Sequence, residues 1–504
     1  MATGKKQENK KTRKPRRVVG VPIQTSGQEN KKARKPESKK IFKPSSSQKN
    51  SGGKASNKTA KRAPGTEESA GEGKTVKGVK VPSLLRGMKD ILPKEGKMWQ
   101  HIRHTAEKIA EAYGFGYIET PVLEEAGLFT RSIGRGTDVV EKEMYVFEDR
   151  DGSKVGLRPE LTASVARAYI GHGMQSLPQP VKMWYLGPMF RHDRPQAGRY
   201  REFHQFDCET IGERDPLNDA ELIVVAYNFF RDLGIATQVH INSIGSLEDR
   251  ARYTVELLGY LRLKRSYLCE DCKRRMQKNP LRVLDCKVEQ CRAQIVDAPQ
   301  IIDWLSEDAK NYFMKVLEYL DTMDIPYILQ STLVRGLDYY TDTVFEFYRE
   351  TTEEGGAQSA LGGGGRYDGL LEQLGGRSVP ACGFALGIER VISALRREQE
   401  GQPEAKEVGI SKVYFAQLGE QARRRALFLI EDLRRNEVFV QHNLGKTSLK
   451  GQLELANRFG ATHALILGQK EVQDGTIIVR DMESGIQEII DQKKIKGELE
   501  KIMR

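Results

Sequence analysis

Hydrophobic and polar positions alternate in two runs near the middle of the chain, VKMWYLGPMF and REFHQFDCETI. Alternation with a period of two is typical of β-strands, because successive side chains point to opposite faces of a sheet. The pattern therefore predicts a hairpin across 181–212, in which two strands flank the polar loop HDRPQAGRY.

One face of the second predicted strand is a candidate binding surface. Its members are Arg201, Phe203, Gln205, Asp207 and Glu209. Phe206 points to the opposite face, so neither face is simply a solvated polar surface. A cation, a flat ring, an amide and carboxylates on one face suit a ligand that combines a phosphate, a base and an ammonium group.

Apolar residues with helical or strand spacing predict further elements on both sides of this hairpin. We expect helices at Met98–Tyr113, 161–170 and Leu217–Leu233, a strand at Tyr117–Pro121, a hairpin turn at Asp151–Gly152, and a charged helical insertion at about 247–325. The segment 413–504 alternates short apolar runs with the helical stretches Gln421–Arg435 and Ser448–Phe459. This rhythm predicts a compact α/β domain with a largely parallel sheet.

Two segments after the insertion combine strand patterns with possible ligand contacts. LVRGLDYYT predicts a strand with Arg335, Leu337 and Tyr339 on one face and Asp338 and Tyr340 on the other. In LGGGGRYDG, four successive glycines allow the backbone to lie directly against a ligand; a flexible hairpin turn is the alternative.

Arginines mark two further candidate anion sites. Arg191 stands where the first strand of the predicted hairpin meets its loop and could clamp a phosphate; a surface salt bridge is the alternative. GFALGIERV predicts a strand that passes into a helix, whose N-terminus and Arg390 favour an anion. Tight packing of strand against helix is the competing interpretation there.

Charge divides the chain at about residue 80. Residues 1–80 hold 23 Lys and Arg against 6 Glu, whereas the remainder holds 58 Lys and Arg against 63 Asp and Glu. With almost no apolar residues, the first 80 are expected to be disordered. This extension is either an arm that raises RNA affinity through phosphate contacts or a solubilising tail.

The remaining composition favours a cytoplasmic protein. No run of about eighteen apolar residues predicts a membrane span, and the first residues lack the apolar core of a secretion signal. Six cysteines in 504 residues do not make a disulfide framework. Four of them follow the spacing C-x2-C…C-x4-C, which is compatible with a zinc site or with reduced, partly buried thiols: Cys269, Cys272, Cys286 and Cys291.

Together these segments resemble the histidyl-tRNA synthetases, a family of class II aminoacyl-tRNA synthetases. Tyr117–Leu123, the Arg191 hairpin and GFALGIERV are similar to the three class II motifs, the first of which builds a dimer interface, and LVRGLDYYT and LGGGGRYDGLL to two peptides peculiar to this family. The resemblance implies an α+β fold. Its parts would be an antiparallel-sheet catalytic core at 81–405 and an α/β anticodon-binding domain at 408–504.

The resemblance also implies a role for each matching residue. Arg191 and Arg335 would flank the α-phosphate of ATP, with Phe203 and Arg390 on either side of adenine. The residues implied for histidine binding are Glu160, Thr162, Gln205, Glu209, Tyr339 and Tyr340. Arg194 and Gln196 would meet the acceptor end of histidine tRNA.

The implied activity is ligation of L-histidine to its tRNA by a homodimer that uses ATP and Mg²⁺. Two alternatives keep the fold without the reaction: a regulatory subunit of histidine biosynthesis and an RNA-binding sensor. Such regulators generally lack the anticodon-binding domain and the pattern around Arg335, and this chain has counterparts of both. The sequence therefore favours the enzyme.

Overall fold

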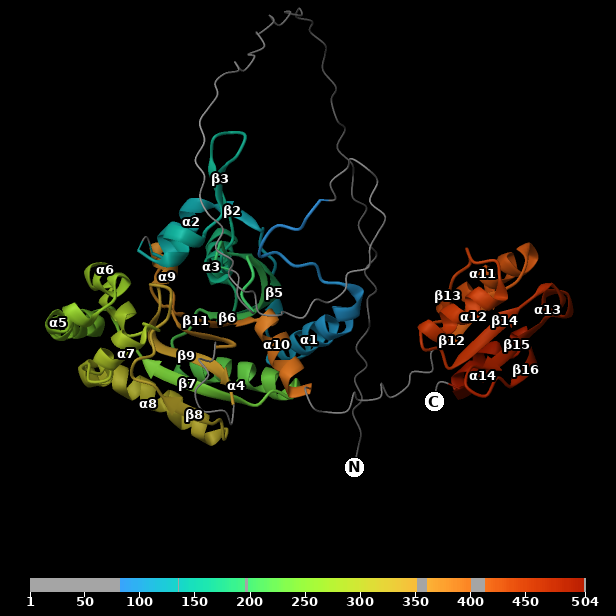
Figure 1. Cartoon of the computed structure of the whole chain (residues 1–504). Coiled ribbons are helices and arrows are strands. Elements are labelled where there is room, and N and C mark those ends of the chain that lie inside the picture. Colours follow the sequence, from blue (N-terminus) through green and yellow to red (C-terminus); the bar gives the residue numbers. More distant parts are fainter. Residues whose placement is uncertain (1–81, 135, 195–197, 351–359, 400–412, 503–504) are drawn as a thin grey trace, which may run out of the picture. The chain divides into compact units, whose positions relative to one another are not determined.

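The computed structural model describes residues 82–134, 136–194, 198–350, 360–399 and 413–502 (Figure 1). The basic extension expected at 1–80 lies outside these ranges. Within them, no helix has both the length and the apolar character needed to cross a membrane.

An eight-stranded sheet forms the centre of 82–399 (Figure 1). Its strand order is β1 (Gly116–Tyr117), β5 (Val181–Phe190), β6 (Glu202–Ile211), β11 (Ala381–Gly387), β10 (Gly362–Arg366), β9 (Thr341–Arg349), β7 (Thr237–Ser243) and β8 (Tyr327–Leu329). The six central strands pair antiparallel, and only the edge strands β1 and β8 pair parallel with their neighbours. The hairpin predicted over 181–212 is β5–β6, paired from Val181↔Ile211 to Phe190↔Glu202.

Helices cover one face of this sheet with a large apolar core. They are α1 (Pro93–Ala112), α4 (Pro216–Asp232), α8 (Glu307–Thr322) and α10 (Ile388–Gln399). Phe206 of β6 packs into this core, while Phe203 of the same strand packs on the other side, as the alternation predicts. Gln205, Asp207 and Glu209 therefore lie on the face opposite these helices, whereas His204 contacts Trp99 of α1 and Glu389 of α10.

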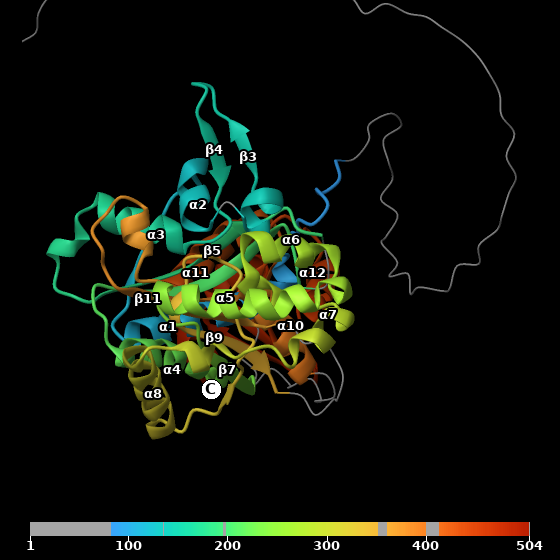
Figure 2. The same ribbon diagram turned by 90° about the vertical axis from the view of Figure 1, so that its left-hand side faces the viewer.

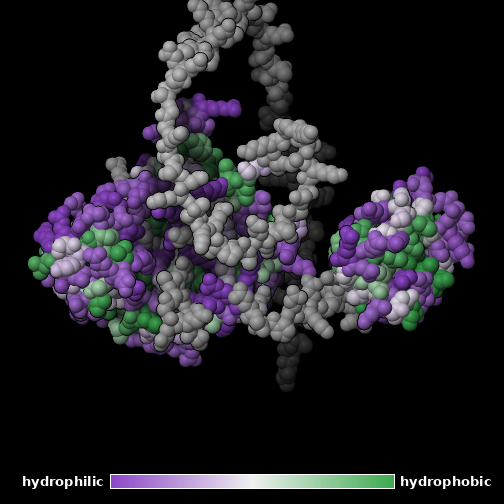
Figure 3. Space-filling view, in the orientation of Figure 1, coloured by the Kyte–Doolittle hydropathy of each residue, from purple (hydrophilic) through white to green (hydrophobic). Residues whose placement is uncertain are grey.

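The opposite face meets α3 (Thr162–Gly171) and the insertion, which share a second core. Of the insertion expected at about 247–325, the part on this face comprises α5 (Leu247–Leu263), η3 (Arg265–Tyr267), α6 (Glu270–Lys278), η4 (Pro280–Val283), α7 (Glu289–Ile295) and η5 (Ile301–Trp304), whereas α8 packs on the other face with α1 and α4. Ser246 and Asp249 start α5 with a reciprocal capping box. The insertion side of the molecule, on the left of Figure 3, is mainly hydrophilic with scattered apolar patches.

A small three-stranded sheet projects beside α3 and carries a hairpin that stands out in Figures 1 and 2. Its order is β2 (Leu123–Glu125), β4 (Lys154–Leu157) and β3 (Val146–Glu148), and the short helices nearby are α2 (Ala126–Ser132), η1 (Val139–Glu143), η2 (Met174–Ser176) and α9 (Leu370–Gln373). The turn predicted at Asp151–Gly152 joins β3 to β4. The strand predicted at Tyr117–Pro121 is wrong beyond Tyr117; Pro121 has no N–H to donate to a neighbouring strand.

The glycine run forms the central strand β10, so the alternative of a flexible hairpin turn is wrong. A Cβ at Gly364 would strike the backbone of Gly383 and Phe384 in the neighbouring β11. Glycine is therefore required there by the close approach of strands. Arg366, which follows the glycine run, is fully buried and pairs with Asp219 of α4 and with Asp368 at 2.8 Å.

Residues 413–502 form a separate five-stranded sheet. Its order is β13 (Gln441–His442), β12 (Val413–Gln417), β14 (His463–Leu467), β15 (Thr476–Asp481) and β16 (Gln487–Asp491), and its helices are α11 (Glu420–Arg435), α12 (Leu449–Arg458), α13 (Gln469–Asp474), η6 (Gln492–Lys494) and α14 (Ile495–Ile502). Strands β13, β12 and β14 are parallel, whereas β15 and β16 are antiparallel. The prediction of a largely parallel sheet is thus wrong for its second half, because β14 and β15 are too close in sequence for a parallel crossover.

Candidate active site

A cavity of about 470 Å³ lies against β6, β10 and β11 on the face of the sheet opposite α1 and α4. Its walls come from the start of α3, the end of β5, the loop before β9 and the first turn of α10. Two arginines of the insertion complete the wall. Segments from across the chain therefore converge on this cavity.

Buried carboxyl groups, a threonine and tyrosines form an acidic pocket beside this cavity, made by Glu160, Thr162, Glu209, Tyr339 and Tyr367. Thr162 Oγ1 donates a hydrogen bond to Glu209 Oε1 at 2.6 Å, and the Tyr367 hydroxyl donates to Glu209 Oε2. Glu160 Oε1 accepts from the backbone N–H of residue 163 at 3.1 Å, and its Oε2 lies 3.4 Å from the Tyr339 hydroxyl. These hydrogen bonds within the protein fix the orientation of both carboxyl groups.

Burial sets the protonation of the acidic pocket. It raises the pKa of Glu209 to about 8, although hydrogen bonds from Thr162 and Tyr367 oppose the shift. Burial also raises the pKa of Glu160. An anionic carboxylate is costly in this environment unless a cation or an N–H donor lies beside it. The acidic pocket therefore suits a ligand that brings an ammonium group and N–H donors.

Tyr340 links the acidic pocket to the cationic part of the cavity. Its ring lies 4.7 Å from that of Tyr339, and the Arg335 guanidinium lies 5.5 Å from the Tyr340 ring centroid. Burial raises the pKa of Tyr340, so its hydroxyl stays neutral and can either donate or accept a hydrogen bond.

Two arginines line the cavity with their orientation already fixed. Arg191 Nε donates to the backbone carbonyl of Pro159 at 2.8 Å, and its guanidinium lies 5.4 Å from the Phe203 ring centroid. Arg335 pairs with Glu346, while its Nε is buried without a partner. Both guanidinium groups thus keep N–H donors for an anion.

Arg390 adds a third cation in an unfavourable electrostatic environment. Its Nη1 donates to the carbonyl of Ala360. Burial, followed by the nearby charges of Arg199 and Arg191, lowers its pKa. A bound polyanion would relieve this repulsion, so the cationic part of the cavity fits a phosphate ligand.

Two more side chains of β6 complete the surface predicted from alternation. Gln205 lines the cavity, and its Oε1 is buried without a partner. Asp207, the next residue on this face, is also buried with both oxygens unpartnered, and burial together with Glu209 and Glu160 raises its pKa well above the usual range. Gln205 therefore has a free acceptor for a ligand, whereas Asp207 is held as a neutral acid.

Ten predicted site residues line the cavity or lie directly against its lining, namely Glu160, Thr162, Arg191, Phe203, Gln205, Glu209, Arg335, Tyr339, Tyr340 and Arg390. Arg194 is exposed and does not line it, and Gln196 lies outside the described residues. The four predicted cysteines lie in the insertion, away from the cavity lining.

The strand predicted for LVRGLDYYT is wrong before Thr341, because residues 333–340 form a loop and turn. The predicted separation of Arg335 and Tyr340 onto opposite faces is wrong for the same reason: the guanidinium lies against the Tyr340 ring. The loop is held by contacts to distant segments, including a hydrogen bond from the backbone N–H of Asp338 to the carbonyl of Ile133 at 3.2 Å. Alternation along the sequence does not reveal such contacts.

Several residues of the site were not singled out from the sequence. Tyr367 stands within the glycine-rich peptide, so its neighbours were the available signal, and Glu346 alternates with Phe345 and Phe347 on β9. Arg275 and Arg282 reach the cavity from the insertion, and nothing in their local sequence indicates it.

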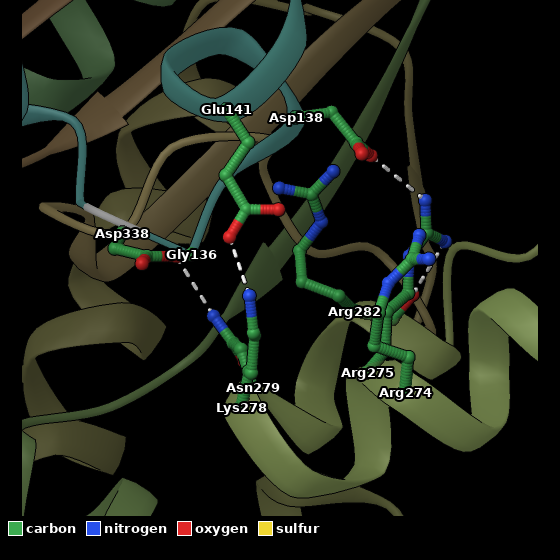
Figure 4. Close-up of a pocket in the computed structure, with 9 residues that line it drawn as sticks. All are labelled: Gly136, Asp138, Glu141, Arg274, Arg275, Lys278, Asn279, Arg282 and Asp338. Atoms are coloured by element: carbon green, nitrogen blue, oxygen red, sulfur yellow. Dashed lines mark hydrogen bonds and ion pairs between the residues drawn. The ribbon is translucent and has the colours of Figure 1, made fainter.

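A smaller cavity of about 20 Å³ lies where the insertion meets the core, and Figure 4 shows the residues around it. Arg275 pairs with Asp138 at 3.2 Å, Lys278 pairs with Glu141, and Asn279 donates to Asp338 at 2.8 Å. These pairs tie α6 to η1 and to the loop that carries Arg335. The insertion is therefore attached to the active-site loop by polar contacts.

Comparison with known proteins gives a consistent result. A family model described as histidyl-tRNA synthetase matches residues 87–246 and 270–391, and one described as an anticodon binding domain matches 412–502. The histidine–tRNA ligase of Dehalococcoides mccartyi strain 195 is 46% identical over 417 residues, which cover 82% of this chain and 98% of the relative. The corresponding ligase of Halothermothrix orenii is 45% identical over 426 residues, 84% of this chain and all of the relative.

Among solved structures, the apo histidyl-tRNA synthetase of S. aureus aligns with a TM-score of 0.68 and 36% identity. The alignment covers 84% of this chain and 100% of that one.

Proposed function

The chain belongs to the histidyl-tRNA synthetase family, and we propose that the cavity described above is where it joins histidine to tRNA. The chain is a histidine–tRNA ligase. In the first step, the carboxylate of L-histidine attacks the α-phosphorus of ATP, the bond to the β-phosphate breaks, and pyrophosphate leaves. In the second step, a hydroxyl at the 3′ end of histidine tRNA attacks the carbonyl carbon of histidyl-adenylate and AMP leaves.

The acidic pocket would select histidine. Glu160 and Thr162 would bind the ammonium group, and Gln205 the backbone of the amino acid. Glu209 and Tyr340 would bracket the imidazole with Tyr339 beside them, so that an acceptor and a phenol satisfy both ring nitrogens. Support comes from the burial that raises the pKa of Glu209 and from the buried Gln205 Oε1, which has no partner and which an amino acid without a matching donor would leave unpaired.

Arg191 and Arg335 would flank the α-phosphate. Negative charge grows on its oxygens as the carboxylate attacks, so fixed cations lower the barrier without any proton transfer by the protein. Support comes from the bonds that hold both guanidinium groups in place, to Pro159 and to Glu346 respectively.

The nucleotide base and the tRNA would occupy the remaining contacts. Phe203 would stack on adenine, with Arg390 covering its other face or reaching the γ-phosphate. Arg194 and Gln196 would contact the acceptor end of the tRNA. The exposure of Arg194 at the loop after β5 is compatible with this role.

We propose that Mg²⁺ enters with the triphosphate, which would supply most of its ligands. Glu346 already accepts hydrogen bonds from Arg335 and Tyr348, and Glu389 from the backbone and ring of His204. These carboxylates are engaged, which fits an ion held chiefly by phosphate oxygens and water. Bound there, Mg²⁺ would offset the charge of the departing pyrophosphate.

The whole chain would work as a cytoplasmic homodimer with a catalytic core at 81–405, an insertion at about 247–325 and an anticodon-binding domain at 408–504. The residue ranges matched by the two family models support the core and the anticodon-binding domain. Support for the dimer is the exposure of apolar side chains in and beside the strands β1, β2 and β3: Tyr117, Leu123, Val146 and Phe147. Sedimentation of the full chain tests it.

The convergence of Arg191, Arg335, Glu209 and Tyr340 on one cavity carries the proposal for the site. Histidine-dependent exchange of pyrophosphate with ATP, followed by aminoacylation of histidine tRNA, tests the function. A purified chain that binds histidine but catalyses neither reaction would instead be a regulator or sensor.

A further inference from the structure

Four cysteine side chains converge in the insertion, outside the active site. Their sulfur atoms all lie within 4.8 Å of one another, and no other His, Cys, Asp or Glu group with metal-binding geometry occurs among the described residues. Cys269 directly precedes α6, Cys272 is in its first turn, Cys286 follows η4, and Cys291 lies in α7. The fold therefore brings both cysteine pairs of the sequence motif together.

The distances match a single ion at the centre of a tetrahedron. Zinc–sulfur bonds of about 2.3 Å place the sulfurs about 3.8 Å apart. The sulfurs of Cys269 and Cys286 are 4.0 Å apart, and all four cysteines are free thiols. The backbone N–H of Cys269 donates to Cys291 Sγ at 3.1 Å, a contact that stabilises a thiolate ligand.

Four sulfur ligands in this geometry favour zinc over other common ions. Thiolates are soft ligands, and a tetrahedral S₄ set is typical of zinc or a single iron. An iron–sulfur cluster binds each thiolate to a metal within a larger core and needs more widely spaced sulfurs. Cys272, Cys286 and Cys291 are buried, so the site is closed to water as in structural zinc sites.

We propose that Cys269, Cys272, Cys286 and Cys291 bind one structural Zn²⁺ that holds the insertion in the shape required by the active site. The ligands enclose α6 and η4, which carry Arg275 and Arg282. Both arginines, which Figure 4 labels, also line the large cavity. Arg282 Nη1 donates to the carbonyl of Gly336, beside Arg335. The metal thus fixes a wall of the cavity from outside it.

Metal analysis of the full chain, purified reduced and without chelator, tests the proposal. We expect about one zinc per chain. After exchange for Co²⁺, the protein should show the absorption bands of tetrahedral thiolate coordination. A reduced chain that contains no zinc and takes up neither Zn²⁺ nor Co²⁺ would overturn the proposal, as would stoichiometric iron.

A pair of variants separates zinc binding from folding. Cys286→Ser/Cys291→Ser should lose the metal, while Cys208→Ala, which removes a buried cysteine of β6, should keep it. If the double variant is insoluble, titration of the wild-type thiols with a mercurial while released zinc is measured gives the same information. Zinc retained by the double variant, or released without reaction of these thiols, would contradict the assignment.

The role in the active site has its own readout. Zinc-free protein should be cleaved faster by protease within 264–300 and should have a raised KM for ATP. Zinc content does not depend on ligase activity, so a failure of the proposed function would leave this test intact. Unchanged proteolysis and KM after complete metal loss would refute the positioning role.

Discussion

Two opposing influences act on the Glu209 carboxyl group. Burial raises its pKa to about 8, whereas Thr162 and Tyr367 stabilise its anion through hydrogen bonds. A folded-state pKa above the unfolded value of 4.5 makes a contribution to stability that is complete below pH 4.5 and is lost as pH rises through about 8. The Glu209 side chain therefore stabilises the free enzyme least at the higher pH, at which it carries the negative charge proposed to bind the ligand.

We expect the melting temperature of the free protein to fall as the pH is raised from 6 to 8. In Glu209→Gln the fall should be smaller, because the amide does not ionise. Saturating histidine should also reduce it in the wild type, since the ligand compensates the carboxylate. Calorimetry at both pH values checks this, and an identical fall in the variant would contradict the assigned cause.

Arg335→Ala should affect the rate of activation far more than histidine binding, because the proposed contact strengthens as charge develops on the phosphate. Loss of one such donor typically costs about 10²–10³-fold in kcat. Pyrophosphate exchange measured against histidine concentration separates kcat from KM. Arg349→Ala is the matched control, because Arg349 pairs with Glu398 at 3.1 Å and does not line the cavity. Equal losses in rate and histidine affinity would rule out this role for Arg335.

At the level of single residues, local sequence predicted side chains on regular strands. Phe203 and Gln205 followed from the alternation in β6, and Arg191 from its place at a strand end. Arg282 and Tyr367 were not predicted, because their contacts join segments distant in sequence. Arg282 contacts Gly336, and Tyr367 contacts Glu209. Those contacts exist only once the chain has folded.

The side chain of Glu209 on β6 lies directly against the backbone of the neighbouring strand β11. Gly383 pairs with Glu209 in register, and a Cβ at Gly383 would overlap the Glu209 carboxyl group. Gly383→Ala should therefore displace Glu209 and lower kcat/KM for histidine on the order of 100-fold, as misplacement by about 1 Å can. Steady-state kinetics for both substrates check this, with KM for ATP nearly unchanged.

Gly127→Ala is the control for this substitution. Gly127 lies in α2 with no atom within 4 Å of the added Cβ. Alanine favours a helix by up to about 1 kcal/mol relative to glycine, so stability should hold or rise and kinetics should not change. Comparable kinetic losses in both variants would show that the effect at Gly383 is not specific to Glu209.

Whole elements were predictable where one periodicity persisted. The helix predicted at Leu217–Leu233 appears as α4, and the predicted hairpin as β5–β6. The glycine run gave no pattern that distinguishes a central strand from a turn, because its place depends on the backbones of β9 and β11. The direction of β15 could have been predicted from the connection between Leu467 and Thr476, which is too short for a parallel crossover.

For the molecule as a whole, the two hypotheses for the basic extension differ in whether it binds tRNA. Deletion of residues 1–78 should leave pyrophosphate exchange unchanged, because the matched regions begin at residue 87 and the lining of the cavity at residue 138. Measuring tRNA affinity at low and high salt then separates the two hypotheses. If the extension is an RNA-binding arm, its deletion should weaken tRNA binding at low salt. If it is a solubilising tail, tRNA affinity should not change.

The buried ion pair between Arg366 and Asp219 joins β10 to α4 immediately before Tyr367. Its anchor, in α4, lies on the helix-covered face of the sheet, whereas the next residue, Tyr367, donates its hydroxyl hydrogen bond to Glu209. Under the proposed role of Glu209, amino acid recognition therefore depends in part on this scaffold, and a change in a helix far from the substrate should alter which amino acid is accepted.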